Sequence, residues 1–147
     1  MDRSKLSAHP LHPLITHFPM ALWTTSLLWD LLGLWREDPL WWSFSFWSIA
    51  VGLIIAFFAM VTGFIDYMKL PQGGPEEGVA MWHMVMVMTA AALYAGSLFF
   101  RFGTTTPSGI HLIMALVLSF LGFVSLLVGG WYGGELVYRY GVGRTKE

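Results

Sequence analysis

Four long apolar segments, separated by short polar connections, constrain this chain most strongly. The segments run approximately over residues 14–35, 41–68, 79–100 and 109–132. Each is close to the roughly 20 residues that an α-helix needs to cross the hydrocarbon core of a bilayer. Because short connections make sequential helices antiparallel neighbours, the sequence predicts an all-α fold with four transmembrane helices in one antiparallel bundle. We expect a single membrane domain over 1–147 with a polar C-terminal tail over 133–147.

The composition agrees with a membrane protein. Hydrophobic residues make up 56% of the chain and charged residues only 12%, whereas about a quarter of the residues of a soluble domain are charged. A chain of 147 residues cannot bury that much apolar surface in its own core, so the lipid bilayer is its expected partner. The net charge of −1 gives no sign of a nucleic-acid partner. The lack of cysteine excludes disulfides, iron-sulfur clusters and thiolate zinc sites.

Positive charges are distributed unevenly between the two predicted ends of the bundle. The end that holds both termini and the middle connection carries Arg3, Lys5, Lys69, Arg139, Arg144 and Lys146, and the other end carries Arg36 and Arg101. Positively charged loops are retained in the cytoplasm. We therefore expect both termini to be cytoplasmic, in a multi-pass protein of the inner (plasma) membrane.

Small residues four positions apart indicate close helix packing. Such pairs are Gly52 and Ala56, Ala59 and Gly63, Ala91 and Ala95, Ala92 and Gly96, Gly129 and Gly133, and Gly130 and Gly134. Four glycines within 129–134 are also expected to loosen the end of the last helix, which would allow an unwound segment or the close approach of a flat ligand.

Histidines and carboxylates within the apolar segments are the candidates for a functional site. A polar side chain in a membrane span is costly, so it normally faces the bundle interior and has a partner. The predicted topology places His17, His83, Asp66 and Glu135 near the cytoplasmic end, where His12 also lies and where Pro19 is expected to bend the first helix beside His17. Toward the other end, Asp30 and His111 are expected to form a structural pair.

Two kinds of cofactor fit these residues. The first is a b-type haem with His17 and His83 as axial ligands, with Gly130, Gly133 and Gly134 allowing close approach of the ring and with Arg139 and Lys69 at the level of its propionates. The second is a divalent metal bound by His17, His83, Asp66 and Glu135. Hydrogen bonding between helices, with no cofactor, is the structural alternative. No catalytic residues are assigned, because no nucleophile and base pair, phosphate loop or dinucleotide fingerprint is present.

Several stretches together resemble one known family. They are His12-Pro13-Leu14-Ile15-Thr16-His17-Phe18-Pro19, Thr62-Gly63-Phe64-Ile65-Asp66-Tyr67, His83, and Gly133-Gly134-Glu135-Leu136-Val137-Tyr138-Arg139-Tyr140-Gly141-Val142. They are similar to landmarks of the bacterial membrane proteins called domain of unknown function 2231. The resemblance implies four helices and no established activity. Members are sometimes joined to Rieske iron-sulfur modules or cytochromes, which by analogy implies electron transfer and a separate membrane or redox protein as partner.

Three functions are consistent with the sequence. The favoured one is a haem-binding or metal-binding redox accessory subunit without catalytic activity of its own. The alternative is a cofactor-free structural subunit that packs against a larger complex. A small transporter or proton conduit that uses Asp66 and Glu135 is the third, although four short helices leave little room for an alternating-access pathway.

Overall fold

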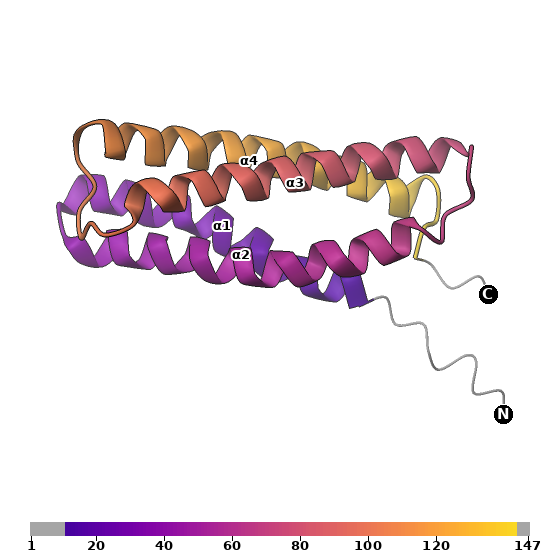
Figure 1. Cartoon of the computed structure of the whole chain (residues 1–147), viewed down its shortest axis with the longest axis horizontal. Helices are drawn as coiled ribbons and strands as arrows, with labels where there is room; N and C mark the ends of the chain where they lie inside the picture. The colour runs from indigo at the N-terminus through magenta and orange to yellow at the C-terminus, as the bar shows by residue number, and fades with distance from the viewer. Residues whose placement is uncertain (1–10, 144–147) are drawn as a thin grey trace, which may run out of the picture.

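The computed structural model describes residues 11–143, and these form four helices joined by short connections. The helices are α1 (Leu11–Arg36), α2 (Pro39–Tyr67), α3 (Pro75–Arg101) and α4 (Gly109–Tyr138). They make one antiparallel bundle (Figure 1). The predicted all-α fold with four helices is confirmed.

Local sequence explains where the helices begin. Asp38 caps the start of α2, since its side chain accepts a hydrogen bond of 2.9 Å from the Leu40 N–H. Pro39 and Pro75 each occupy a first helical position, where proline removes no helical hydrogen bond. The connection before α3 turns at Gly73, whose φ of 78° suits glycine.

Three of the four helices, α2, α3 and α4, are long and apolar enough to cross a membrane. Helix α1 is not among them, although a span over residues 14–35 is predicted from the sequence. It has the length, but Asp30, His17, Pro19 and several hydroxyl side chains dilute its apolar character. The structure therefore supports a membrane protein with three apolar spans and one more polar helix.

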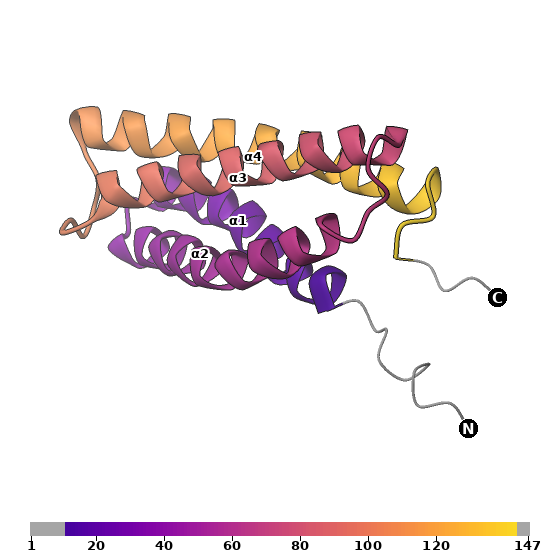
Figure 2. The same cartoon turned by 45° about the vertical axis from the view of Figure 1, so that its right-hand side comes forward.

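The four helices associate as two hairpins. Helix α1 packs mainly against α2, and α3 packs mainly against α4, while contacts of α2 with α3 and of α1 with α4 are fewer. In Figures 1 and 2 the α3–α4 hairpin lies above the α1–α2 hairpin. We call the end where α1 and α3 begin the histidine end, and the end where they finish the arginine end.

Helix α4 extends beyond the predicted span. It runs without interruption through 129–134 and ends at Tyr138, so the predicted polar tail over 133–147 begins inside the helix. The predicted unwound segment at the glycines is therefore wrong. A physical reason is that Gly129 and Gly133 lie against α3, with Met86 and His83 in contact range of the positions their Cβ atoms would take. Helix α1 likewise continues through Pro19.

The two hairpins place buried residues at equivalent positions. In α1 the buried stripe is Pro19, Trp23, Ser26 and Asp30, and in α3 it includes Ala90, Tyr94, Ser97 and Arg101. Every α3 position in this set follows its α1 counterpart by 71 residues, as 101 follows 30. The stripes share their spacing but not their residue types.

The second helices of the two hairpins agree in the same way. The buried residues Ser45, Ile49, Gly52, Ala56 and Ala59 of α2 correspond to Ala115, Ser119, Gly122, Leu126 and Gly129 of α4, with a constant shift of 70 residues. The described chain is thus an internal repeat of one helical hairpin. The two copies run in the same direction along the bundle, so α1 is equivalent to α3 and α2 to α4 (Figure 1).

The core is formed where the copies meet. The rings of Trp23 and Tyr94, which are equivalent residues, stack with centroids 4.8 Å apart and planes 20° apart. Trp23 lies over Gly52 and Tyr94 lies over Gly122, at distances that leave no room for a Cβ atom at either glycine without displacement. The Tyr94 hydroxyl donates a hydrogen bond of 3.2 Å to the Trp23 carbonyl. Glycine on the second helix of each copy therefore makes room for the aromatic ring on the first.

Candidate functional site

Three pairs of equivalent residues meet between the two hairpins. They are His12 with His83, Trp23 with Tyr94, and Asp30 with Arg101. Members of each pair are 71 residues apart. The histidine and the ion pair are separated by 18 residues of helix, which corresponds to about 27 Å along the bundle. The aromatic pair lies between them.

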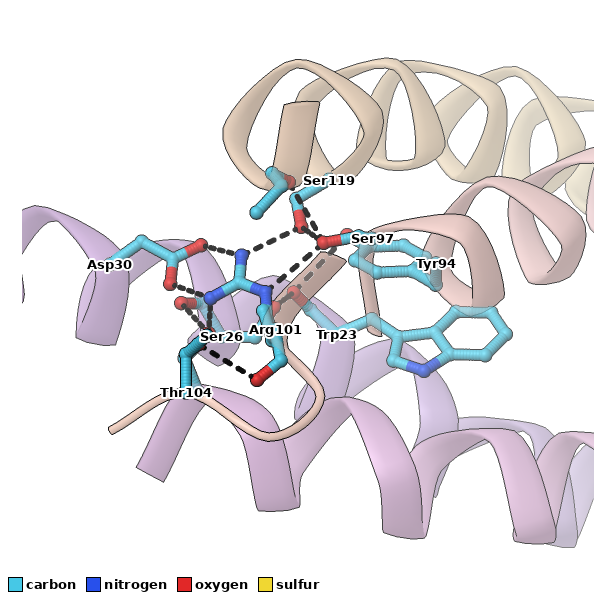
Figure 3. Close-up of polar contacts among 10 residues, drawn as sticks. Trp23, Ser26, Asp30, Tyr94, Ser97, Arg101, Thr104 and Ser119 are labelled. Carbon is cyan, nitrogen blue, oxygen red and sulfur yellow. Dashed lines mark hydrogen bonds and ion pairs between the residues drawn. The ribbon is translucent and has the colours of Figure 1, made fainter. Parts of the chain in front are cut away.

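At the arginine end, Asp30 and Arg101 form a buried ion pair (Figure 3). The two Arg101 Nη atoms donate to the two Asp30 carboxylate oxygens at 2.6 and 2.8 Å. The exposed fractions of these residues are 1% for Asp30 and 2% for Arg101. Two parallel hydrogen bonds of this kind fix the orientation of both side chains.

The remaining donors of Arg101 are also satisfied. Its Nε donates to Ser97 at 3.1 Å, Nη1 donates to Ser45 at 3.1 Å, and Nη2 donates to Ser119 at 3.2 Å. A guanidinium has five N–H donors, and all five have an acceptor here. The network draws residues from all four helices, so it ties the two hairpins together and leaves the guanidinium no donor for a ligand.

The predicted pairing of Asp30 with His111 is wrong. His111 is exposed, and its Nδ1 lies 3.2 Å from the Phe100 carbonyl. Because Arg101 follows an apolar segment, the sequence predicts that it is one of the positive charges in a connection. It is instead the last residue of α3, and its side chain is buried in the bundle. Arg101 follows Ala90, Tyr94 and Ser97 at helical spacing, which places it on the same buried face of α3.

At the histidine end, His12 and His83 are held in matching ways. Nδ1 of His12 lies 2.8 Å from the Ala59 carbonyl, and Nδ1 of His83 lies 2.8 Å from the Gly129 carbonyl. A carbonyl can only accept, so each Nδ1 is the donor. In a neutral imidazole the proton on Nδ1 leaves a lone pair on Nε2. The carbonyls belong to equivalent residues of α2 and α4.

A glycine lies beside each imidazole. A Cβ atom on Gly63 would lie 2.7 Å from Cε1 of His12, and one on Gly133 would lie 3.1 Å from Cε1 of His83. The two ring centroids are 6.3 Å apart, and the ring planes are nearly perpendicular at 88°. Glycine thus admits each histidine to the space between the hairpins.

The Nε2 atoms of this pair are chemically available. Within residues 11–143, neither Nε2 takes part in a hydrogen bond. Every buried side-chain nitrogen or oxygen in this range has a hydrogen-bond partner, so the two Nε2 atoms are not buried. Both histidines are half-buried. The two lone pairs are therefore reachable from the surface, in contrast to the closed network at the arginine end.

His17, the predicted partner of His83, is exposed, and His12 instead faces His83. The buried stripe of α1 explains this placement. His12 precedes the buried Pro19 by seven residues, which is close to two helical turns and keeps it on the inner face. His17 lies on a different face. Ser26 and Asp30 also follow His12 by close to whole numbers of helical turns, and this spacing identifies His12 as the inner histidine.

The two predicted carboxylates are engaged in ion pairs near the histidine end. Asp66 lies 2.9 Å from Nζ of Lys69, and Glu135 lies 2.6 Å from Nη1 of Arg139. The hydrogen bond with Glu135 is the main reason that the pKa of Arg139 is raised. No group of three or more histidines or carboxylates in the part of the chain that the structure describes could hold a metal ion.

The three glycines that were predicted to allow close approach of a haem ring do not all lie beside the histidine pair. Gly133 contacts His83, but a Cβ atom on Gly130 would have no neighbour within 4 Å, and one on Gly134 would reach only Tyr138 at 4.0 Å. Two of the surface hollows, of about 330 Å³ and about 560 Å³, are lined by neither His12 nor His83. The first is lined by Leu127, Val128, Trp131 and Tyr132, and the second by residues of the α2 start and the α3–α4 connection.

The apolar helices, their polar interior and the repeated hairpins define a small helical membrane protein. The chain belongs to the family of predicted membrane proteins DUF2231, whose model matches residues 8–146. No curated protein and no solved structure matches the chain.

Proposed function

We propose that all four helices cross the bacterial inner membrane and that both termini lie in the cytoplasm. Helix α1 has 26 residues, or about 39 Å, which exceeds the hydrocarbon thickness of about 30 Å. Its buried polar residues, Ser26 and Asp30, face the bundle interior and have hydrogen-bond partners. Polar groups placed in this way are compatible with a span.

The charge distribution supports this orientation. Lys69 and Arg139 lie near the histidine end, and the sequence before α1 and after α4 contains further positive residues. At the arginine end, Arg101 is neutralised by Asp30, which leaves Arg36 as the positive residue of that end within the described chain. The bias toward a cytoplasmic histidine end is thus larger than the loop count indicated.

Cysteine labelling tests the orientation directly, because the chain has no native cysteine. We expect a membrane-impermeant maleimide to label Thr105→Cys in intact spheroplasts and to label Gly73→Cys only after lysis. The two positions lie in the connections at opposite ends of the bundle. The reverse pattern would overturn the orientation, and labelling of both positions on one side would overturn the four-span topology.

Within this topology, the chain serves as an accessory protein that holds a transition-metal centre for a separate redox protein. The observation that supports this function is the pair of imidazoles at His12 and His83, with Nδ1 anchored to a backbone carbonyl and Nε2 unengaged. Metal-binding histidines commonly have this second hydrogen bond, which fixes the tautomer and orients the ring. His12 replaces His17 as the proposed ligand from α1.

The centre is either a metal ion bound directly or the iron of a b-type haem, since both accept two imidazoles. In a redox role His12 and His83 would hold this centre, which would supply one-electron transfer between a donor protein and an acceptor protein. The residues around the pair favour an ion over a porphyrin. Of the three glycines predicted to admit the haem ring only Gly133 contacts a histidine of the pair, and Arg139 is already paired with Glu135.

A cofactor-free structural subunit is the second candidate function, and the outer face of α4 favours it. Trp131 is 77% exposed, Leu127 is also exposed, and the adjacent Gly130 has open space around it. A ridge of large apolar side chains beside a glycine notch is suited to packing against another membrane helix. This function requires no ligand at the histidine pair.

The first experiment is metal analysis combined with an ultraviolet-visible spectrum of the detergent-purified protein, expressed with ample haem and trace metals. We expect a bound metal that is absent from His12→Asn and His83→Asn and present in His17→Asn. A Soret band with the same dependence would identify haem as the centre. A colourless, metal-free protein under all supply conditions would contradict the metal-binding function and leave the structural subunit.

A further inference from the structure

We infer that the metal centre is a single monovalent copper ion, bound in line between Nε2 of His12 and Nε2 of His83. This inference rests on the proposed metal-binding function and assigns its ligand. It follows from the spacing of the two rings, from the number of ligands and from the charge of the site.

The distance between the ring centroids matches the one expected for two imidazoles that bind one ion from opposite sides. With metal–nitrogen bonds of about 2.0–2.1 Å, ligands on opposite sides of an ion place their ring centroids about 6.3 Å apart, whereas a tetrahedral angle places them about 5 Å apart. The centroids of His12 and His83 are 6.3 Å apart. Each ring is also fixed by its Nδ1 hydrogen bond and by the adjacent glycine.

The number of ligands excludes a structural zinc site from the described residues. Zinc in such sites requires four ligands, usually all from protein. Within residues 11–143, no third histidine or carboxylate joins His12 and His83 in a metal-binding group, and the chain has no cysteine. Monovalent copper has a filled d shell and forms stable complexes with two nitrogen donors in line, and imidazole is a suitable ligand for copper.

The charge of the site points in the same direction. Both ligands are neutral imidazoles, and the carboxylates of Asp66 and Glu135 are each paired with a basic side chain. The cost of placing an ion in a medium of low dielectric grows with the square of its charge, so a divalent ion without a carboxylate ligand is penalised more than a monovalent one. The site therefore selects a cation with a single charge.

The position between the hairpins also has a consequence for binding. Each copy of the repeat supplies one equivalent ligand, anchored to an equivalent carbonyl. The two histidines should therefore contribute similarly to affinity. A bound ion would join the hairpins at the histidine end, as the ion pair joins them at the arginine end.

The test is a copper titration of the full-length protein in detergent under anaerobic, reducing conditions, against a chromophoric chelator specific for monovalent copper. The informative variants are His12→Asn and His83→Asn, because an asparagine amide can still donate to the carbonyl but lacks the Nε2 ligand. His17→Asn is the matched control. Circular dichroism and size-exclusion profiles establish that each variant is folded, and X-ray absorption at the copper edge reports the coordination number.

We expect one copper per chain, two-coordinate by X-ray absorption. Affinity should fall at least a hundredfold in each of the two variants and less than twofold in His17→Asn. Haem bound through the same histidines, or four-coordinate zinc bound more tightly than copper, would overturn the copper assignment while leaving the metal-binding function intact. Copper binding that survives both variants would also overturn it. Failure to bind any metal would overturn both the assignment and the function.

Discussion

Each end of the bundle joins two residues that are equivalent in the repeat, but the two ends differ in how completely their polar atoms are hydrogen-bonded. At the arginine end, Arg101 has all five of its N–H donors bonded, and Asp30 faces it with both oxygens. At the histidine end, each imidazole uses Nδ1 within its own hairpin and leaves Nε2 without a hydrogen bond. Each end pairs two residues that are equivalent in the repeat, but only the histidine end has unused bonding capacity.

This difference separates a structural role from a binding role. Ionisable residues within a membrane protein are by default candidates for function, and by that rule both ends qualify. Counting donors and acceptors distinguishes them. The saturated end stabilises the association of the hairpins, while the unsaturated end has atoms available for a ligand.

The largest expected effect is at the arginine end. Asp30→Asn leaves a buried guanidinium without its counter-ion, and a guanidinium cannot neutralise itself by losing a proton. We expect a loss of about 3–5 kcal/mol in the free energy of unfolding, measured by thermal or denaturant unfolding in detergent. His12→Asn is the comparison at the other end. Equal stability of Asp30→Asn and the parent protein would show that the network is not structural.

Exchanging the two charges tests the repeat itself. Asp30→Arg and Arg101→Asp each place like charges at equivalent positions, so each single variant should unfold readily. The double variant restores an opposite pair at the same location. We expect it to recover about half or more of the 3–5 kcal/mol lost on breaking a buried pair. A double variant no more stable than the weaker single variant would contradict the equivalence of the two positions.

Glycine substitutions should show an intermediate effect. A Cβ on Gly52 would collide with the buried Trp23 ring, and one on Gly122 would lie 3.0 Å from Tyr94. We expect Gly52→Ala to destabilise the protein by about 1–3 kcal/mol. Gly130→Ala is the matched control because its Cβ would meet nothing within 4 Å. It should leave stability unchanged or raise it by up to about 1 kcal/mol. Equal effects at Gly52 and Gly130 would argue against the described packing.

A smaller effect is expected for the histidines in metal-free protein. His83→Asn can keep a hydrogen bond to the Gly129 carbonyl, so the stability loss should remain near or below about 1 kcal/mol. Added metal should raise the melting temperature of the parent protein and not that of His83→Asn. A metal-induced shift that persists in this variant would place the ligand elsewhere.

The smallest effect is expected for the half-buried carboxylates Asp66 and Glu135. They form ion pairs with the exposed side chains of Lys69 and Arg139, and such pairs contribute little and are screened by salt. Asp66→Asn and Glu135→Gln should leave metal affinity and melting temperature within experimental error. A loss of metal binding in either variant would bring these residues back as ligands, and loss of ion flux in liposomes would support a transporter.

Much of the fold follows from the sequence, because length and apolarity are properties of each segment alone. The four helices are predictable in this way, and the spacing of small residues predicts the close packing at Gly52, Gly63 and Gly129. Rotation of a helix about its axis is harder to predict in a membrane protein. Lipid-facing and buried positions are both apolar, so the hydrophobic pattern of a helix does not reveal its inner face.

The candidate site shows where that ambiguity matters. His12 and His17 are both near the start of α1, and only the stripe formed by Pro19, Ser26 and Asp30 identifies His12 as the inner one. The internal repeat is difficult to recognise in the sequence for a related reason. Asp30 matches Arg101 and Trp23 matches Tyr94 in position but not in side-chain type, so a comparison of residue identities does not detect the relationship.

The opposite charges at Asp30 and Arg101 have a consequence for how the two halves can associate. Two copies of the first hairpin would bring two carboxylates together on the shared axis, and two copies of the second would bring two guanidinium groups together. Only the mixed pair is electrostatically favourable. A symmetric ancestor assembled from identical halves could not use this bond, whereas joining the halves in one polypeptide makes the correct partner always present and always adjacent.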